Sequence, residues 1–140
     1  MVQKTPEMSS AVKEVTDVYP EQARLQFMKI RRLVLESADN LQVGPLQEEL
    51  RWGEPAYLTT ETKAGTTLRI AWKPKNPDRV GIYVNCQTSL VEEFRQQYHD
   101  SFYFEGNRGL LVDCNKALPE EALGGVIAAT LTYHRRKKSA

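Results

Sequence analysis

The segment TTLRIAW (residues 66–72) decides the fold. Its apolar residues Leu68, Ile70 and Trp72 alternate with small or polar residues, which is the pattern of a strand with one buried face and one wet face. Such half-buried strands are typical of antiparallel sheets. We therefore expect an antiparallel sheet at the centre of this protein.

Neighbouring segments extend the sheet on both sides. The turn sequence KPKNPD (73–78) leads into a second alternating segment, and the loop ETKAG (61–65) separates TTLRIAW from an earlier strand. A further hairpin is expected across the Gly-Asn-Arg sequence at 106–108. The expected strands cover residues 57–60, 66–72, 80–84, 102–105 and 109–113.

Helices are expected before, between and after these strands. Residues 20–37 open with Pro-Glu, which suits a helix N-terminus, and carry Ala23, Phe27, Ile30 and Val34 at helical spacing. Further helices are expected at residues 10–17, at 45–52 (PLQEELRW), from Thr88 or Ser89 onward, and at 119–138.

Together these elements predict an α+β fold, a two-layer sandwich with helices packed on one face of a five-stranded, mainly antiparallel sheet. A chain of 140 residues suits one domain. We place this domain at residues 19–138, with residues 1–18 as an N-terminal tail or short helix.

The charge balance bears on the class of partner. Nineteen Lys and Arg stand against eighteen Asp and Glu, a net charge of +1, whereas nucleic-acid and anionic-membrane binders carry a clear basic excess. We expect no nucleic-acid or membrane partner. The one basic run, HRRKK (134–138), reads as a solvated helix C-terminus, with an RNA or acidic-partner contact as the alternative.

Catalytic motifs are absent from the sequence, which contains no nucleophile elbow, phosphate loop or HExxH. Cys86 and Cys114 form no CxxC or zinc spacing, so we expect reduced thiols in a cytoplasmic protein. A pairing of either cysteine with His99 stays open as an enzymatic alternative. The expectation is a non-enzymatic protein.

The segment RWGEPAY (residues 51–57) is the candidate binding site. Gly53 permits a positive φ, and Pro55 imposes extended geometry on Glu54, so the turn would hold Trp52 and Tyr57 in defined directions. Either both aromatic residues fill the edge of the core, or they line a pocket. In the second case the ligand-binding residues are Arg51, Trp52, Gly53, Glu54, Pro55 and Tyr57.

A second candidate site consists of carboxylates. Glu48, Glu49 and Glu54 lie close together in the sequence, and oxygen ligands suit hard cations such as iron. These three residues are the candidate metal ligands.

The order of the long helix, the RWGEPAY segment and the LRIAW hairpin resembles the YdhG-like family of bacterial proteins. Members carry a Trp-Gly-x-Pro-x-Tyr element after the first long helix, which Trp52, Gly53, Pro55 and Tyr57 match. The resemblance spans about residues 19–136 and implies a small α+β domain similar in shape to frataxin. Some relatives are described as intracellular iron chaperones.

Two functions follow as expectations. The first is a small-molecule or protein binding module centred on RWGEPAY, as a monomer or a homodimer. The second is a frataxin-like iron-binding protein that uses Glu48, Glu49 and Glu54, with iron as its cofactor. Frataxin-like proteins bind iron along an acidic first helix, whereas Arg31 and Arg32 make the corresponding helix basic here.

Overall fold

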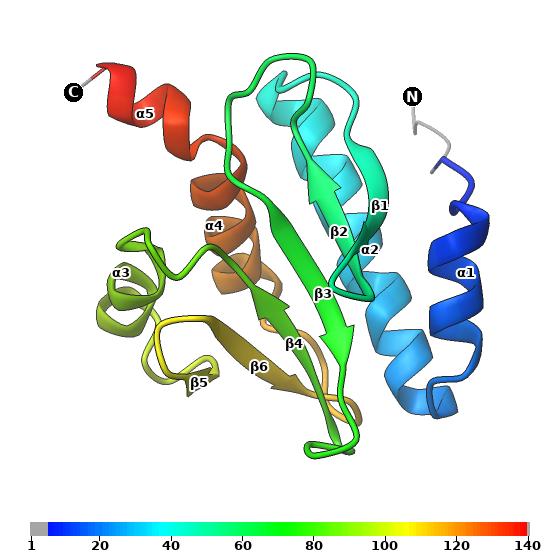
Figure 1. Ribbon diagram of the computed structural model, residues 1–140. Helices are drawn as coiled ribbons and strands as arrows, with labels where there is room; N and C mark the ends of the chain where they lie inside the picture. Colours follow the sequence, from blue (N-terminus) through cyan, green and yellow to red (C-terminus); the bar gives the residue numbers. More distant parts are fainter. Residues whose placement is uncertain (1–5, 140) are drawn as a thin grey trace.

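In the described part of the chain, the fold comprises six strands and five helices in an α+β arrangement. The computed structural model describes residues 6–139 of the chain. Figure 1 shows the order of the elements. The helices are α1 (Ser10–Asp17), α2 (Glu21–Leu41), α3 (Leu90–Gln97), α4 (Glu120–Leu131) and α5 (Tyr133–Ser139). The strands are β1 (Gln47–Arg51), β2 (Glu54–Leu58), β3 (Leu68–Trp72), β4 (Arg79–Tyr83), β5 (Tyr103–Glu105) and β6 (Gly109–Asp113).

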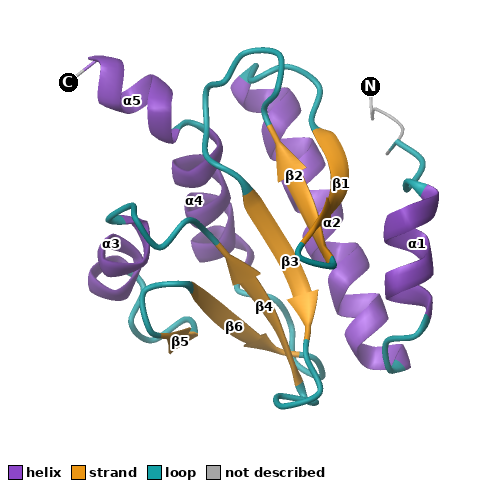
Figure 2. Ribbon diagram, viewed as in Figure 1, coloured by secondary structure: helices purple, strands orange, loops and turns teal. Residues whose placement is uncertain are grey.

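The six strands form one antiparallel sheet in the order β1-β2-β3-β4-β6-β5. Helices α2 and α4 lie together behind the sheet in Figure 2, α1 lies beside the β1 edge, and α3 lies near the end of α4. The expectation of a mainly antiparallel α+β fold is confirmed.

The core fills the space between the sheet and the helices. Phe27 and Ile30 of α2 pack in one buried cluster with Leu68 and Ile70 of β3 and with Ile127 of α4. The same cluster includes Val12 of α1, which is fully buried, so this short helix belongs to the packed structure. The period-2 pattern of LRIAW therefore directs alternate residues toward the helices, as expected.

The segment PLQEELRW contains the main error of the sequence-based fold. It was expected to form a helix, but residues 47–51 form β1, which raises the strand count from five to six. Strand β1 pairs with β2 along its whole length, from Gln47 opposite Leu58 to Arg51 opposite Glu54. Hydrogen bonding to a neighbouring strand outweighs the helix-favouring composition of QEEL.

Two helix ends also differ from expectation. Helix α2 continues past residue 37 through Asp39-Asn40 and ends at Leu41, and its C-cap Gln42 adopts the left-handed conformation. The expected helix 119–138 is split at Thr132, because the N–H of Arg135 donates to the carbonyl oxygen of Ala64 in the β2–β3 connection. This tertiary hydrogen bond fixes α5 beside that connection.

Candidate functional site

The RWGEPAY segment forms a two-residue hairpin turn between β1 and β2. Trp52 and Gly53 occupy its two central positions with φ angles of 51° and 76°, and Arg51 pairs with Glu54 on either side. Positive φ at both central residues is the geometry of a type I′ turn, which favours Asn-Gly. The side chain of Trp52 is not in the core, since this residue is 87% exposed. Of the two alternatives for Trp52, the one in which its side chain fills the edge of the core is therefore wrong.

Trp52 lies beside the side of the sheet that faces away from α2 and α4. We call this side, which carries Arg69, Tyr83, Arg79 and Tyr103, the helix-free face. The guanidinium of Arg69 on β3 lies 4.9 Å from the centroid of the Trp52 ring and 5.5 Å from that of Tyr83 on β4. The carboxylate of Glu54 forms ion pairs with Arg69 and, at 3.4 Å, with Lys73. Arg69 is thus held between two rings and a carboxylate.

Tyr83 lies flat across the centre of the helix-free face. A Cβ placed at Gly81 would lie 2.5 Å from the Tyr83 ring, and one at Gly109 would lie 2.6 Å from it. The two glycines therefore make room for the ring, which is 2% exposed and packs with Ala71 and Leu111 in a second small apolar cluster. Burial raises the pKa of the Tyr83 hydroxyl, as do the nearby carboxylates of Glu105 and Glu54. The phenol is therefore neutral at physiological pH.

The far end of this face repeats the pairing of a cation with an aromatic ring. The guanidinium of Arg79 lies 3.6 Å from the centroid of the half-exposed Tyr103 ring. It also lies 3.7 Å from the carboxylate of Asp113. The helix-free face is thus a layer of aromatic rings covered by cations that carboxylates hold in place.

The other expected ligand-binding residues lie on both sides of the sheet. Arg51 is exposed and pairs with Glu49. Tyr57 is fully buried on the helix side of the sheet, which agrees with the alternative that placed it in the core. Its hydroxyl donates to the carboxylate of Glu48 over 2.7 Å. Pro55 lies in β2 opposite Leu50.

Glu48 is the acceptor in a buried polar cluster. Its carboxylate accepts hydrogen bonds from Arg31 Nε at 2.6 Å, from the Tyr57 hydroxyl and from the backbone N–H of Ser9. The Arg31 and Glu48 side chains are 4% and 10% exposed. Burial alone would raise the pKa of the Glu48 carboxyl, but these hydrogen bonds and the charge of Arg31 outweigh it and hold the pKa below its usual range. The cluster ties α1, α2, β1 and β2 together.

The three candidate iron ligands do not converge. Glu48 points to the helix side, where it pairs with Arg31, while Glu49 pairs with Arg51 and Glu54 pairs with Arg69. Within residues 6–139, no group of three or more His, Cys, Asp and Glu side chains could hold a metal ion. Each of the three carboxylates therefore already has a protein cation as its counter-ion.

Both cysteines are free thiols in separate places. Cys86 is exposed and Cys114 is half-buried. Burial and the nearby carboxylates of Asp78 and Asp113 raise the pKa of the Cys114 thiol, which disfavours the reactive thiolate.

Sequence reasoning found the turn but missed Arg69, Lys73, Tyr83, Arg79 and Tyr103. Four of these residues lie on strands outside RWGEPAY and Lys73 directly follows β3, and only the register of the sheet brings them to one face. The alternation that buried Leu68 and Ile70 also places Arg69 and Ala71 on the opposite face, which was the available signal.

Comparison of the chain with protein-family models, curated proteins and solved structures yields no match. In the described part of the chain, none of the helices has the length and apolar character needed to span a membrane. The interpretation of the site therefore depends on its geometry.

Proposed function

We propose that this protein is a non-enzymatic binding module whose helix-free face, with Trp52 as its anchor, binds an acidic surface of a protein partner. The observation that carries the proposal is the state of Trp52, which is both 87% exposed and in the left-handed conformation. Both features cost free energy, and a binding role explains both.

The cost of Trp52 follows from elementary terms. A bulky L-residue in the left-handed region costs about 1–2 kcal/mol, which Gly or Asn at this turn position would largely avoid. Burial does not offset this cost, because the ring remains in water apart from its contact with Arg69. On binding, the same ring would lose its water contacts and contribute apolar area.

The composition of the face supports a protein partner. Trp, Tyr and Arg are the residues that most often dominate binding energy at protein interfaces. Arg69 is already fixed by Glu54 and by two rings, so little side-chain entropy remains to be lost on binding. The buried ring of Tyr83 lies beneath Arg69 and Lys73 and supports their cationic groups at the surface of the sheet.

The exposed charge of the face indicates an acidic partner. In most of its ion pairs the cation is more exposed than the carboxylate, as in Arg51 with Glu49 (52% and 28%) and Lys75 with Glu105 (63% and 25%). In the ion pairs of Lys73 with Glu54 and of Arg79 with Asp113, the cation is again the more exposed partner. The face therefore presents positive charge outward although its formal charges are nearly balanced, and complementary charge favours encounter with carboxylates.

The resemblance to the YdhG-like family, with its frataxin-like shape and a cytoplasmic location, stays part of this proposal. The iron-binding alternative has less support, because Glu48, Glu49 and Glu54 are paired with different cations on two faces of the sheet.

The test is affinity capture from an extract of the source cells with four baits. These are the wild-type chain, Trp52→Asn, Arg69→Gln and the control Leu25→Ala, which removes another exposed apolar side chain, on α2. Asn tolerates the left-handed turn, so loss of binding would not reflect unfolding.

The proposal expects one partner that wild type and Leu25→Ala retain and that both site variants lose. Hydrogen exchange of the complex should show protection at the β1–β2 turn and β3, and binding should weaken with added salt. Equal retention by Trp52→Asn and wild type would refute the proposal.

A further inference from the structure

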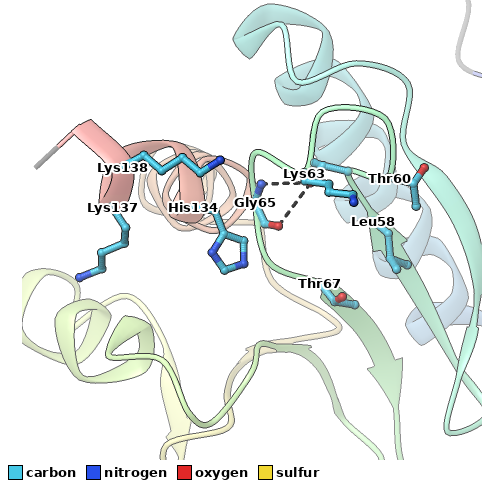
Figure 3. A pocket seen from close by; sticks show the side chains of 9 residues that line it. Leu58, Thr60, Lys63, Gly65, Thr67, His134, Lys137 and Lys138 are labelled. Carbon is cyan, nitrogen blue, oxygen red and sulfur yellow. Dashed lines mark hydrogen bonds between the residues drawn. The ribbon is translucent and has the colours of Figure 1, made fainter.

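A second feature lies at the other end of β2 from the Trp52 turn. An open depression of about 840 Å³ separates α5 from the β2–β3 connection (Figure 3), within the range of pockets that hold small molecules. Its lining includes Leu58, Thr60, Lys63, Thr67, His134 and Lys138. The proposed binding of a protein partner by the helix-free face does not involve any of these residues.

The two walls of the depression are joined by specific contacts. The N–H of Thr66 donates to the carbonyl of Thr130 over 3.0 Å, and the N–H of Arg135 donates to that of Ala64 over 2.9 Å. A Cβ at Gly65 would lie 2.3 Å from the Leu131 carbonyl oxygen, so the connection packs directly against the end of α4. The spacing between the walls is thus fixed by the fold.

The guanidinium of Arg135 secures α5 from a third direction. It donates to the carbonyl oxygens of Leu41 and Gln42 at the end of α2, over 3.0 and 3.1 Å. Arg135 is therefore a structural cation, whereas the neighbouring residues His134 and Lys138 face the depression.

The side chains that line the depression carry positive charge without acidic counterparts. Lys63 lies on the loop side and Lys137 and Lys138 lie on α5, while no Asp or Glu of the described residues is part of the lining. Among the described residues, the three lysines take part in none of the ion pairs found. In Figure 3, Lys138 extends toward the loop side, while Lys137 points away from it. Lys138 is therefore the α5 lysine directed at the depression, and Lys63, whose ammonium group points toward Thr60 in Figure 3, is the lysine of the loop wall.

The backbone of Lys63 adds an independent observation. This residue has a φ of 55°, and its N–H donates to the Thr59 carbonyl over 2.7 Å in a tight turn. Glycine or asparagine would adopt this conformation at lower cost, and within residues 6–139 the lysine side chain forms no ion pair in return. Strained residues of this kind cluster at ligand sites.

We propose that this depression binds a phosphorylated small molecule, with its phosphate group between Lys63 and Lys138. Lysine ammonium groups on two walls neutralise the phosphate charge, and the hydroxyls of Thr60 and Thr67 supply hydrogen-bond donors. Leu58 provides an apolar surface for the remainder of the molecule.

A small molecule fits better than a nucleic-acid backbone. Nucleic-acid-binding domains present a basic stripe and a pI above about 9. This chain has a pI of 7.8 and a net charge of +1, and these cations are confined to one depression.

The test is isothermal titration calorimetry of the full chain at a fixed ionic strength of about 0.15 M. The probes are ATP, inorganic pyrophosphate, adenosine and a single-stranded RNA oligonucleotide. The variants are Lys63→Gln, Lys138→Gln and the double variant, with Lys29→Gln on the exposed side of α2 as the matched control. Circular dichroism establishes that each variant is folded.

The proposal expects saturable binding of ATP and pyrophosphate but not of adenosine. Each single substitution should weaken binding about threefold and the double substitution about tenfold, while Lys29→Gln leaves it unchanged, as expected for partly solvated charge pairs. Absence of saturation, an equal loss in Lys29→Gln, or RNA binding tighter than ATP binding would overturn it.

Discussion

The buried cluster around Glu48 yields the sharpest prediction about stability. The change is Glu48→Gln, which keeps the size of the side chain and removes its charge. In the wild type, this carboxylate accepts hydrogen bonds from Arg31, Tyr57 and the N–H of Ser9, and the Arg31 and Glu48 side chains are 4% and 10% exposed. The variant leaves the Arg31 guanidinium buried without its counter-ion.

The magnitude follows from that burial. Removing one partner of a buried ion pair costs about 3–5 kcal/mol, mostly because an uncompensated charge remains. A domain of this kind has a total stability of about 5–15 kcal/mol, so the loss is a large fraction. For a chain of this length, we expect the melting temperature to fall by about 10–20 °C.

The assay is urea unfolding followed by circular dichroism, with Glu49→Gln as the matched control. Glu49 is the adjacent residue and pairs with the half-exposed Arg51, so its substitution should cost less than about 1 kcal/mol. Combining Arg31→Met with Glu48→Gln should cost less than the sum of the single changes, because the orphaned charge is removed. The reasoning would be refuted if Glu48→Gln and Glu49→Gln unfolded at the same urea concentration.

Three further predictions use the same methods. Folding lowers the pKa of the Glu48 carboxyl, so its ionised form stabilises the folded state at pH values above its unfolded pKa. This stabilisation is lost as the pH falls through the folded pKa. Below about pH 5, the free energy of unfolding should therefore fall less steeply with pH for Glu48→Gln than for wild type. Trp52→Asn should be more stable than Trp52→Ala by roughly 0.5–1 kcal/mol in urea unfolding, because both lose the ring but only Asn tolerates the left-handed turn; equal stabilities would contradict the strain. Gly65→Ala should lower the free energy of unfolding by more than about 2 kcal/mol, because the added Cβ would meet the Leu131 backbone. Gly124→Ala is the control: its Cβ would have no atom within 4 Å, so it should stabilise α4 by up to about 1 kcal/mol. A tolerated Gly65→Ala would contradict the fixed spacing of the two walls of the depression.

The central strands were predictable because their signal is local. Leu68, Ile70 and Trp72 alternate within one short segment, and that period follows from strand geometry alone. Strand β1 was not predictable in the same way, since QEELR favours a helix until β2 pairs with it across the Trp52-Gly53 turn. Pairing of this kind depends on the tertiary structure.

The candidate site was predictable only in part, for the same reason. The metal-site hypothesis was based on Glu48, Glu49 and Glu54 lying close together in the sequence. As a strand, β1 sends the carboxylates of Glu48 and Glu49 to opposite faces, where Arg31 and Arg51 neutralise them. The turn was found from its own residues, but the surroundings of Trp52 depend on sheet register.

The most direct test of the central claim is photocrosslinking from the turn itself. A photoreactive phenylalanine analogue is placed at position 52 and, as a control, at position 25 on α2, and the full chain is irradiated in its source cells. If the helix-free face is a recognition surface, position 52 yields one discrete adduct that the Arg69→Gln change reduces, and position 25 yields none. No adduct from position 52, or the same adducts from both positions, would contradict the account.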